Sequence, residues 1–347
     1  MPESARALLR GWQAASAHLI TNPPAPGRAS ARRCIAEYGA SRLWYYPPPT
    51  SPARREPLLL VYAMVNRPTV LDLLPGRSFI GALRAQDRAV YLLEWGDPDQ
   101  AGYNRGLSHL LGRRMQALVQ AALRHSGRAT ITMAGICQGG VLSLLYALRF
   151  PAQIKALILL GTPVDFQTPG SLLYQRVREV DTRLLDDAWC LDGALLVQLF
   201  HSLQPMRNSL AKYLQLAEDC ADGEAVAEKV RLFQAMQAWI ADCPDQPARV
   251  FHEFILNFYQ RNVLCRQGLV LDGELLKPQQ LAVPVLNIYG TRDHIVPADS
   301  SRALASLVPK QCYAELAVES GHIGMFVSRR ALQSVPEKIQ VWLDQLS

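Results

Sequence analysis

The hydrophobic positions of this chain change their period along the sequence, and two kinds of segment alternate. A continuous apolar run at residues 57–65 is typical of a strand buried on both faces, and further predicted strands occupy residues 88–95, 129–133, 154–160, 283–289 and 312–318. Segments of helical length and period lie between or beside them, at residues 77–86, 107–125, 141–149, 300–308 and 336–346. Strands that alternate with helices in this way predict a mostly parallel sheet with helices on both faces.

This alternation stops between residues 167 and 271, where the sequence predicts helices without buried strands. Their ranges are 195–203, 210–219, 225–241 and 248–262. A helical insertion between two strands of an α/β sheet is most simply a cap over the active site. We therefore divide the chain into a first part of the core at 57–166, a cap at 167–271 and a second part of the core at 272–347.

Residues 1–56 precede the core. The sequence predicts an amphipathic helix at 4–20, a proline-rich linker at 22–28, and one or two edge strands within 34–46. The proline-rich stretch at 47–52 ends these strands, because proline cannot continue a hydrogen-bonded ladder. Packing on the body of the protein is the simplest role for the helix, and binding a partner is the alternative.

Composition and charge narrow the class of protein. Of the 347 residues, 49% are apolar and 19% are charged, as in an ordinary globular protein. The net charge of +6 suits an anionic substrate such as a nucleotide-bearing thioester, or an acidic partner. Because no run of lysine and arginine sits beside interleaved aromatic residues, we do not expect nucleic acid as a ligand.

The cysteines and the apolar stretches indicate the cellular compartment of the protein. Seven cysteines, an odd number at wide spacing and without a Cys-x-x-Cys pair, argue against a disulfide framework and against a zinc site. No apolar stretch reaches the length of a transmembrane segment, and the first residues lack the order of a secretory signal. The sequence thus predicts a cytoplasmic protein without a metal or a cofactor.

One turn carries the candidate nucleophile. The motif Gly135-x-Cys137-x-Gly139 lies between an apolar run and a predicted helix. Its form is that of the nucleophile elbow, Gly-x-Ser-x-Gly, with Cys137 in the place of the serine. The glycines allow a turn too tight for a Cβ, and the turn would aim the backbone N–H of Gln138 at the reacting carbonyl oxygen. A buried cysteine in a glycine-rich turn is the alternative, which this motif alone does not exclude.

Two further residues follow predicted strands at the positions that such an elbow requires. Asp293 comes after the strand at 283–289, and His322 comes after the strand at 312–318. The chain order nucleophile, acid, histidine is that of the α/β-hydrolase fold, in which the three meet at the carboxyl ends of the strands. Alone, Asp293 is more often a turn residue and His322 a structural histidine, but together with the elbow they predict a catalytic triad.

The roles of these residues follow from their chemistry. His322 would take the thiol proton or pair with the thiolate, and Asp293 would hold the tautomer of the imidazole. The second oxyanion donor is expected in the loop after the strand at 57–65, as the N–H of Val65 or Asn66, with a preference for Val65. A cysteine nucleophile forms a thioester, which keeps the acyl group activated for transfer to an alcohol. The triad therefore favours an acyltransferase, although cysteine hydrolases exist.

Sequence blocks between residues 58 and 343 carry a resemblance to a known family. In chain order they are Asn66-Arg67-Pro68, Tyr91-Leu92-Leu93-Glu94-Trp95-Gly96, Gly135-Ile136-Cys137-Gln138-Gly139-Gly140, Thr162-Pro163-Val164-Asp165-Phe166, Pro244-Asp245-Gln246, Phe258-Tyr259-Gln260-Arg261-Asn262, Pro284-Val285-Leu286-Asn287-Ile288-Tyr289, Asp293-His294-Ile295-Val296-Pro297 and Gly321-His322-Ile323-Gly324. With these blocks the sequence resembles the polyhydroxyalkanoate synthases, especially the short catalytic subunits of class III.

The resemblance implies an activity: polymerisation of (R)-3-hydroxyacyl-coenzyme A, usually 3-hydroxybutyryl-CoA, with release of coenzyme A. The catalytic cysteine, aspartate and histidine of the family map onto Cys137, Asp293 and His322. In the family the histidine activates the cysteine, and the aspartate helps to activate the 3-hydroxyl group, directly or through the histidine. His294 is then a structural neighbour of the acid.

The resemblance also implies partners. These are a second copy in a homodimer, a second, non-homologous synthase subunit, or both, together with the growing polyester and the surface of polymer granules. The N-terminal helix and the cap are the candidate contact surfaces. The chain departs from the family pattern at Glu94, where aspartate is usual, and at 103–108 and 191–196, and these departures concern substrate preference and partner contacts more than the chemistry.

Two other functions stay open at this point. One is hydrolysis on the same triad, by a thioesterase or a polyester depolymerase. The other is a catalytically silent subunit that acts in granule assembly. The presence of Cys137, Asp293 and His322 together argues against the silent subunit, because assembly requires none of them.

Overall fold

The main sheet forms the centre of the fold. The computed structural model describes residues 3–19, 29–50, 55–98, 105–185, 188–203 and 210–346. Within these ranges the sheet has eight strands, in the spatial order β1 (Arg33–Tyr38), β2 (Ser41–Tyr46), β6 (Arg88–Glu94), β3 (Arg55–Val61), β7 (Ile131–Ile136), β8 (Ile154–Leu160), β13 (Val285–Gly290) and β14 (Tyr313–Val318). From β6 to β14 every neighbouring pair is parallel, whereas β1 and β2 form an antiparallel hairpin at one edge.

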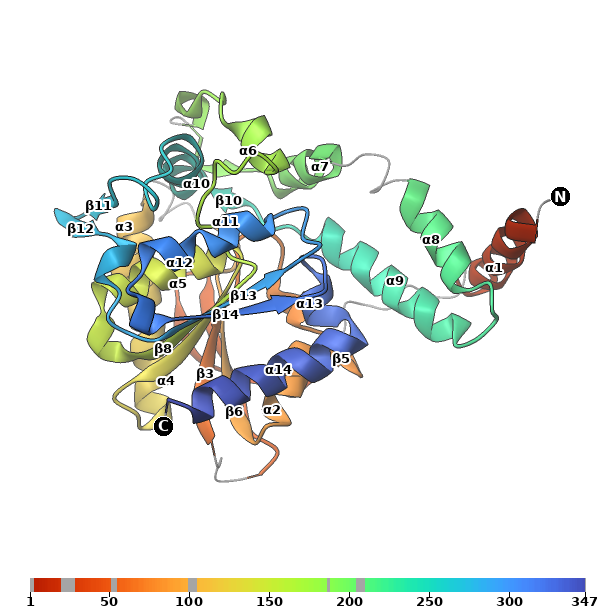
Figure 1. The fold of residues 1–347 in the computed structure, drawn as a ribbon, viewed down its shortest axis with the longest axis horizontal. Helices are drawn as coiled ribbons and strands as arrows, with labels where there is room; N and C mark the ends of the chain where they lie inside the picture. Colours follow the sequence, from red (N-terminus) through yellow and green to blue (C-terminus); the bar gives the residue numbers. More distant parts are fainter. Residues whose placement is uncertain are drawn as a thin grey trace.

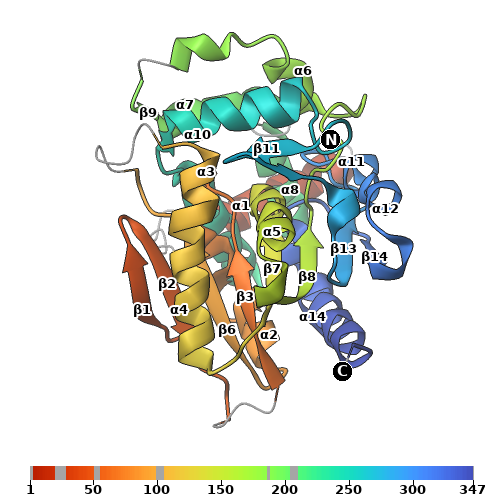
Figure 2. The same ribbon diagram turned by 90° about the vertical axis from the view of Figure 1, so that its left-hand side faces the viewer.

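The apolar runs became strands because both faces of the sheet are covered. Alternate side chains of β3 point to opposite faces. Leu59 and Val61 belong to the cluster formed with α4 (Gln116–Ser126) and α5 (Gln138–Arg149). Leu58 and Leu60 pack in the other cluster, with α2 (Phe79–Arg84) and α14 (Arg329–Asp344). Figure 2 shows α4 and α5 in front of the sheet with α2 and α14 behind it. The expected edge strands and the helices on both faces are therefore confirmed.

The last helix begins earlier than the sequence predicted. The prediction placed its start at residue 336. In the structure α14 begins at Arg329, and the hydroxyl of Ser328 accepts a hydrogen bond from the N–H of Ala331. Pro336 lies inside the helix, in an apolar stripe that already starts before it. The serine cap and the buried stripe outweigh the N–H that the proline lacks.

The cap at 167–271 is mainly helical. Its helices are α6 (Leu172–Val177), α7 (Gly193–Leu203), α8 (Lys212–Asp219), α9 (Val226–Ala241) and α10 (Ala248–Phe254), the last continued by a π-helical turn (Ile255–Gln260). It also contains the strand β11 (Leu269–Leu271), paired with β12 (Glu274–Leu276), and a small ribbon of β9 (Cys190–Leu191) and β10 (Gln246–Pro247). The sequence predicted helices without buried strands here, and it missed these strands of two or three residues because such short strands leave no periodicity in the sequence.

The helices of the cap segment differ in their packing. Phe254 and Phe258 belong to the same hydrophobic cluster as one face of the sheet, and Ala235 and Trp239 of α9 belong to the cluster on the other face. By contrast, α8 and the N-terminal part of α9 extend away from the body of the molecule together with α1 (Glu3–Leu19), as Figure 1 shows. The domain boundaries given above stay a prediction.

The N-terminal helix packs on the cap and not on the sheet. Ala15 of α1 forms a small core with Leu216 of α8 and Val230 of α9. A Cβ on Gly11 would lie 1.8 Å from the carbonyl oxygen of Ala217, so the two helices approach closely at this glycine. The predicted linker at 22–28 lies outside the described residues. Within the described ranges, no helix combines the length and the apolar character needed to cross a bilayer.

Candidate active site

Cys137 lies at the sharp turn between β7 and α5. Its backbone has φ 52° and ψ −121°, a left-handed conformation that costs a non-glycine residue about 1–3 kcal/mol. A Cβ on Gly135 would lie 2.4 Å from the Cα of Gly140, and one on Gly139 would lie 2.2 Å from the carbonyl oxygen of Val61. The glycines of the motif are thus required by the tight packing of the turn, as in a nucleophile elbow.

The other two members of the predicted triad come from loops after neighbouring strands. Asp293 follows β13 and His322 follows β14. His322 Nδ1 lies 2.6 Å from Asp293 Oδ2, and Cys137 is close enough to contribute to the raised pKa of the imidazole. Asp293 is held in place because its other oxygen, Oδ1, accepts the N–H groups of Ile295 and Val296 at 2.9 Å each. The structure therefore brings the three predicted residues together.

The charge of His322 is set by its neighbours. Complete burial disfavours the imidazolium, but the carboxylate of Asp293 and the sulfur of Cys137 favour it more strongly, so the pKa of His322 is raised well above its usual value. The side chain of His322 is 6% exposed and that of Asp293 is not exposed at all. Cysteine nucleophiles occur in such environments, beside a histidine that can hold the proton of the sulfur.

The loop after β3 contains both candidates for the second oxyanion donor. Val65 lines the same cavity as Cys137 and Gln138. The N–H of Asn66 is directed to the sulfur of Cys243, whereas the N–H of Val65 has no partner among the described residues. Gln138 is the first residue of α5, where backbone N–H groups have no partner within the helix. These contacts favour Val65 over Asn66 and leave the N–H of Gln138 available as the other donor.

A cavity of ≈ 630 Å³ opens above Cys137. Its walls are mostly apolar and come from α6, α7, α9 and α10 of the cap and from the loops after β3, β13 and β14. Lys212 is the single lysine among the described residues that line the cavity, and neither arginine nor a carboxylate is among them. Such a cavity suits an apolar ligand with a few polar or anionic groups.

Two tyrosines near the sulfur were not predicted from the sequence. Burial raises the pKa of Tyr62 and of Tyr259, and the neighbouring Cys137 raises both further, so their hydroxyl groups stay neutral. Both residues line the cavity. Tyr62 lies within the apolar run at 57–65, which was predicted as a buried strand. Tyr259 belongs to one of the blocks that carry the family resemblance, which was the only signal for it.

His294 also lines the cavity, beside Ile295 and Val296, while the adjacent Asp293 contacts His322. In the described part of the chain, no group of three or more His, Cys, Asp or Glu side chains is arranged to hold a metal ion. All seven cysteines lie in the described ranges and have free thiols.

The fold and the site together define a class. Residues 19–328 match the family model of the alpha/beta hydrolase fold. Among solved structures, a membrane phospholipase A described as a novel bacterial virulence factor is similar, with a TM-score of 0.56, 15% identity, and 99% and 92% of the two chains covered. An alpha/beta hydrolase fold protein from Nakamurella multipartita has a TM-score of 0.51, 14% identity and coverage of 89% and 97%. At these identities they show the fold alone, and the predicted α/β-hydrolase fold is confirmed.

Similar sequences narrow this class to a family. The poly(3-hydroxyalkanoate) polymerase subunit PhaC of Allochromatium vinosum is 39% identical over 294 residues, which are 84% of this chain and 82% of that protein. The PhaC subunits of Thiocystis violacea (39% identity, 85% and 82% coverage) and of a Synechocystis species (36%, 83% and 78%) are also similar. The chain belongs to the family of poly(3-hydroxyalkanoate) polymerase PhaC subunits, and the resemblance seen in its sequence is confirmed.

Proposed function

We propose that this chain is an acyltransferase that polymerises (R)-3-hydroxyacyl-CoA, with 3-hydroxybutyryl-CoA as the expected substrate, into a polyester and releases coenzyme A. The observation that carries the proposal is the contact of Cys137, His322 and Asp293 at a cavity in a chain of the PhaC family. The polymer is the product named in the descriptions of the relatives.

The first step is acylation of Cys137. Its sulfur attacks the thioester carbonyl, a new carbon–sulfur bond forms, and the bond to the coenzyme A sulfur breaks. The thiol proton passes through His322 to the departing coenzyme A thiolate. The negative charge on the carbonyl oxygen in the transition state would be stabilised by the N–H groups of Gln138 and Val65.

Elongation uses the same groups. The 3-hydroxyl of a second substrate attacks the acyl thioester of Cys137, an ester bond forms, and the carbon–sulfur bond breaks. His322 accepts the hydroxyl proton and returns it to the sulfur, and the lengthened acyl-CoA then acylates Cys137 again. Because Asp293 is buried and both its oxygens already accept hydrogen bonds, we propose that it acts through His322 and not on the 3-hydroxyl itself.

The choice between transfer and hydrolysis depends on the acceptor. The acyl group on Cys137 stays activated as a thioester, and the apolar walls of the cavity disfavour water more than they disfavour an acyl chain with a hydroxyl group. We keep as proposals a homodimer, a second, non-homologous subunit and attachment to polymer granules.

The decisive experiment measures coenzyme A release from (R)-3-hydroxybutyryl-CoA by the purified chain and sizes the product. Release with formation of insoluble polyester supports the proposal. Release with only free 3-hydroxybutyrate would identify a thioesterase. No release, with and without a candidate partner subunit and with longer acyl chains, would identify a silent member of the family.

A further inference from the structure

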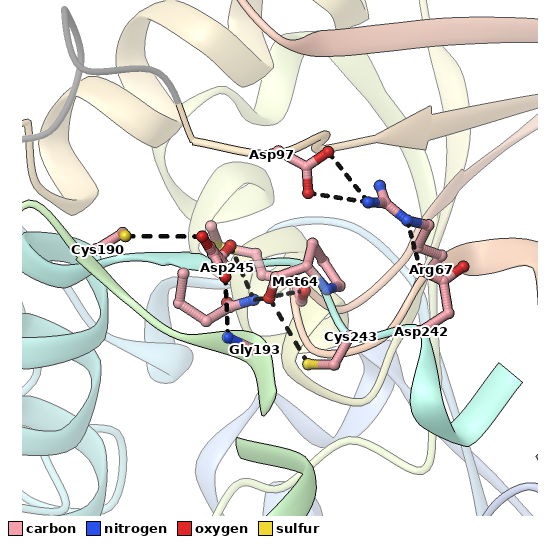
Figure 3. Close-up of polar contacts among 10 residues, drawn as sticks. Met64, Arg67, Asp97, Cys190, Gly193, Asp242, Cys243 and Asp245 are labelled. Carbon is pink, nitrogen blue, oxygen red and sulfur yellow. Dashed lines mark hydrogen bonds and ion pairs between the residues drawn. The ribbon is translucent and has the colours of Figure 1, made fainter. Parts of the chain in front are cut away.

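The loop at residues 64–67, which includes the proposed oxyanion donor, is held by the cap. We call residues 239–246 the clamp segment. The indole Nε1 of Trp239 donates to the carbonyl oxygen of Arg67 at 2.7 Å. In return, Nε of Arg67 donates to Asp242 Oδ1 at 2.9 Å, as Figure 3 shows. The loop and the C-terminal end of α9 therefore each donate one hydrogen bond to the other.

Asn66 adds a second contact with the clamp segment. Its backbone has φ 59°, a left-handed conformation that asparagine tolerates better than most residues. Its side-chain Nδ2 reaches the carbonyl oxygens of Trp239 and Ile240 at 3.3 and 3.2 Å. These carbonyls belong to the last turn of α9, where no intrahelical partner is available. The contact satisfies the helix end and holds the bend of the loop.

Gln246 makes the contact that bears on chemistry. Its Nε2 donates to the carbonyl oxygen of Met64 at 2.9 Å, and the residue is only 2% exposed. On the core side, the N–H of Met64 donates to Oε1 of Gln138 at 2.9 Å. The residue before the proposed donor is thus held between the nucleophile helix and the cap.

The planar geometry of the peptide bond lets this contact fix the direction of the Val65 N–H. The carbonyl of Met64 and the N–H of Val65 belong to one planar trans peptide, so they point in opposite directions. Because Gln246 holds the carbonyl, the N–H of Val65 must point away from Gln246. Val65 itself lines the cavity, together with Cys137.

Gln246 is in turn fixed to the roof of the cavity. It pairs with Leu191 in the ribbon of β9 and β10. The preceding Asp245 accepts the N–H of Gly193, the first residue of α7, at 2.9 Å, and Cys190 lies beside the same carboxylate (Figure 3). Since α7 lines the cavity, the contact with Met64 connects the substrate-facing helices to the loop of the oxyanion donor.

We propose that Gln246 is a positioning residue that aims the N–H of Val65 at the reacting carbonyl oxygen, so that the oxyanion site is complete only when the cap is seated on the core. This inference rests on the proposed acyl chemistry at Cys137. Gln246 itself does not contact the substrate in this proposal. If Gln246 only tethered the cap to the core, its loss would weaken the cap but would slow all reactions of Cys137 to a similar extent.

The test compares two reactions of the same sulfur in the full-length chain. Acylation by p-nitrophenyl acetate passes through an oxyanion and releases a burst of p-nitrophenol, whereas alkylation by iodoacetamide forms no oxyanion. We expect Gln246→Leu to slow acylation and the turnover of 3-hydroxybutyryl-CoA by about 10- to 100-fold, the range for a weakened oxyanion donor. The alkylation rate of Cys137 should change by less than about twofold, since the thiol and His322 are untouched.

The matched control is Gln260→Leu. Gln260 is another cap glutamine whose Nε2 donates to a backbone carbonyl, that of Val180 at 2.8 Å, away from the 64–67 loop. It should change neither reaction by more than about threefold, since only the loss of a tether is involved. Equal slowing of acylation in both variants would overturn the inference.

A second variant covers the case in which Gln246→Leu fails to fold. Gln246→Glu keeps the size of the side chain, and its carboxyl group donates to Met64 only when protonated. Relative to the unaltered chain, its acylation rate should therefore be higher at mildly acidic pH and fall as the carboxyl ionises. The proposal would be contradicted if the acylation rate of Gln246→Glu, divided by that of the unaltered chain, did not change with pH. Parallel losses of acylation and alkylation would also contradict it.

The ester burst also separates this inference from the proposed function. It needs Cys137 and the oxyanion site but not a coenzyme A substrate. If the unaltered chain shows the burst but does not release coenzyme A, the proposed function fails and the role of Gln246 is still measurable. If turnover occurs and Gln246→Leu leaves both turnover and the burst unchanged, only the role of Gln246 fails.

Discussion

The floor and the roof of the cavity are built in different ways. On the floor, Cys137, Asp293 and His322 each follow a strand of the buried parallel sheet, and hydrogen bonds fix them further. The roof consists of cap helices with large apolar side chains that are exposed to solvent, such as Leu184 at 79% and Leu195 at 53% exposure. Changes on the floor should therefore abolish chemistry, whereas changes in the roof should adjust it.

The largest effect is expected at the nucleophile. Cys137→Ala removes the only atom that is proposed to carry the acyl chain, so coenzyme A release should fall by at least about 10³-fold. The melting temperature should change little, because alanine keeps the Cβ and the backbone conformation of this turn and only the sulfur atom is removed. Both are measured on one preparation, by thiol release and by thermal unfolding. Polymer formation by this variant would show that another residue is the nucleophile.

The next effect concerns the acid. Asp293→Asn keeps the shape of the side chain but presents an amide to His322 and favours the wrong tautomer, with an expected loss of about 10²- to 10⁴-fold. If Asp293 acts only through His322, the ester burst should fall as much as polymerisation does. A variant that acylates normally but does not elongate would place Asp293 directly on the 3-hydroxyl group.

The ion pair on the floor also predicts how stability depends on pH. The folded pKa of His322 is raised, so its contribution to stability is complete below the unfolded pKa of about 6.5 and is lost as the pH rises through the folded pKa. Denaturant unfolding of the chain and of His322→Gln should therefore differ more at acidic than at alkaline pH. A difference that grows with rising pH would mean that the buried imidazole is neutral in the folded state.

The smallest effect is expected in the roof. Lys212 lines the cavity and its side chain contacts Gln237, so it can attract the phosphates of coenzyme A. Lys212→Gln should raise KM for 3-hydroxybutyryl-CoA by about 3- to 10-fold, equivalent to about 1 kcal/mol, and leave kcat unchanged. The acyl-pantetheine analogue, which lacks these phosphates, should show no change.

The control for Lys212 is Lys229→Gln, which removes the same charge from α9 at an ion pair with Asp222. Equal effects of the two lysine variants would mean that net charge attracts the substrate and no local contact does.

The sequence predicted the floor better than the roof for a physical reason. A strand buried on both faces must be apolar throughout, so β3, β7 and β13 were recognisable, and the residues that follow them could be placed at one edge of the sheet. The ribbon of β9 and β10 has two residues in each strand and left no such pattern. Its position, and with it that of Gln246, depends on contacts across the fold.

The same limit applies to single residues of the site. Tyr62 continues an apolar run, and nothing in its neighbourhood marks it as a group that faces a cavity. The choice between Val65 and Asn66 needed the contact of Asn66 with Cys243, which lies far away in the sequence. The start of α14 depended on the hydroxyl of Ser328, a cap that lies before the predicted start at 336.

The attachment of α1 to the cap has a consequence for the order in which the molecule assembles. This helix is synthesised before the helices that cover its buried face, α8 and α9, which lie after six strands of the main sheet. Contacts between such distant segments form slowly, because a long loop must close before they contribute. A nascent chain therefore carries Ala15 and the rest of this face uncovered until most strands of the sheet have been made. A helix that is made before the sheet is thus among the last to reach its final contacts.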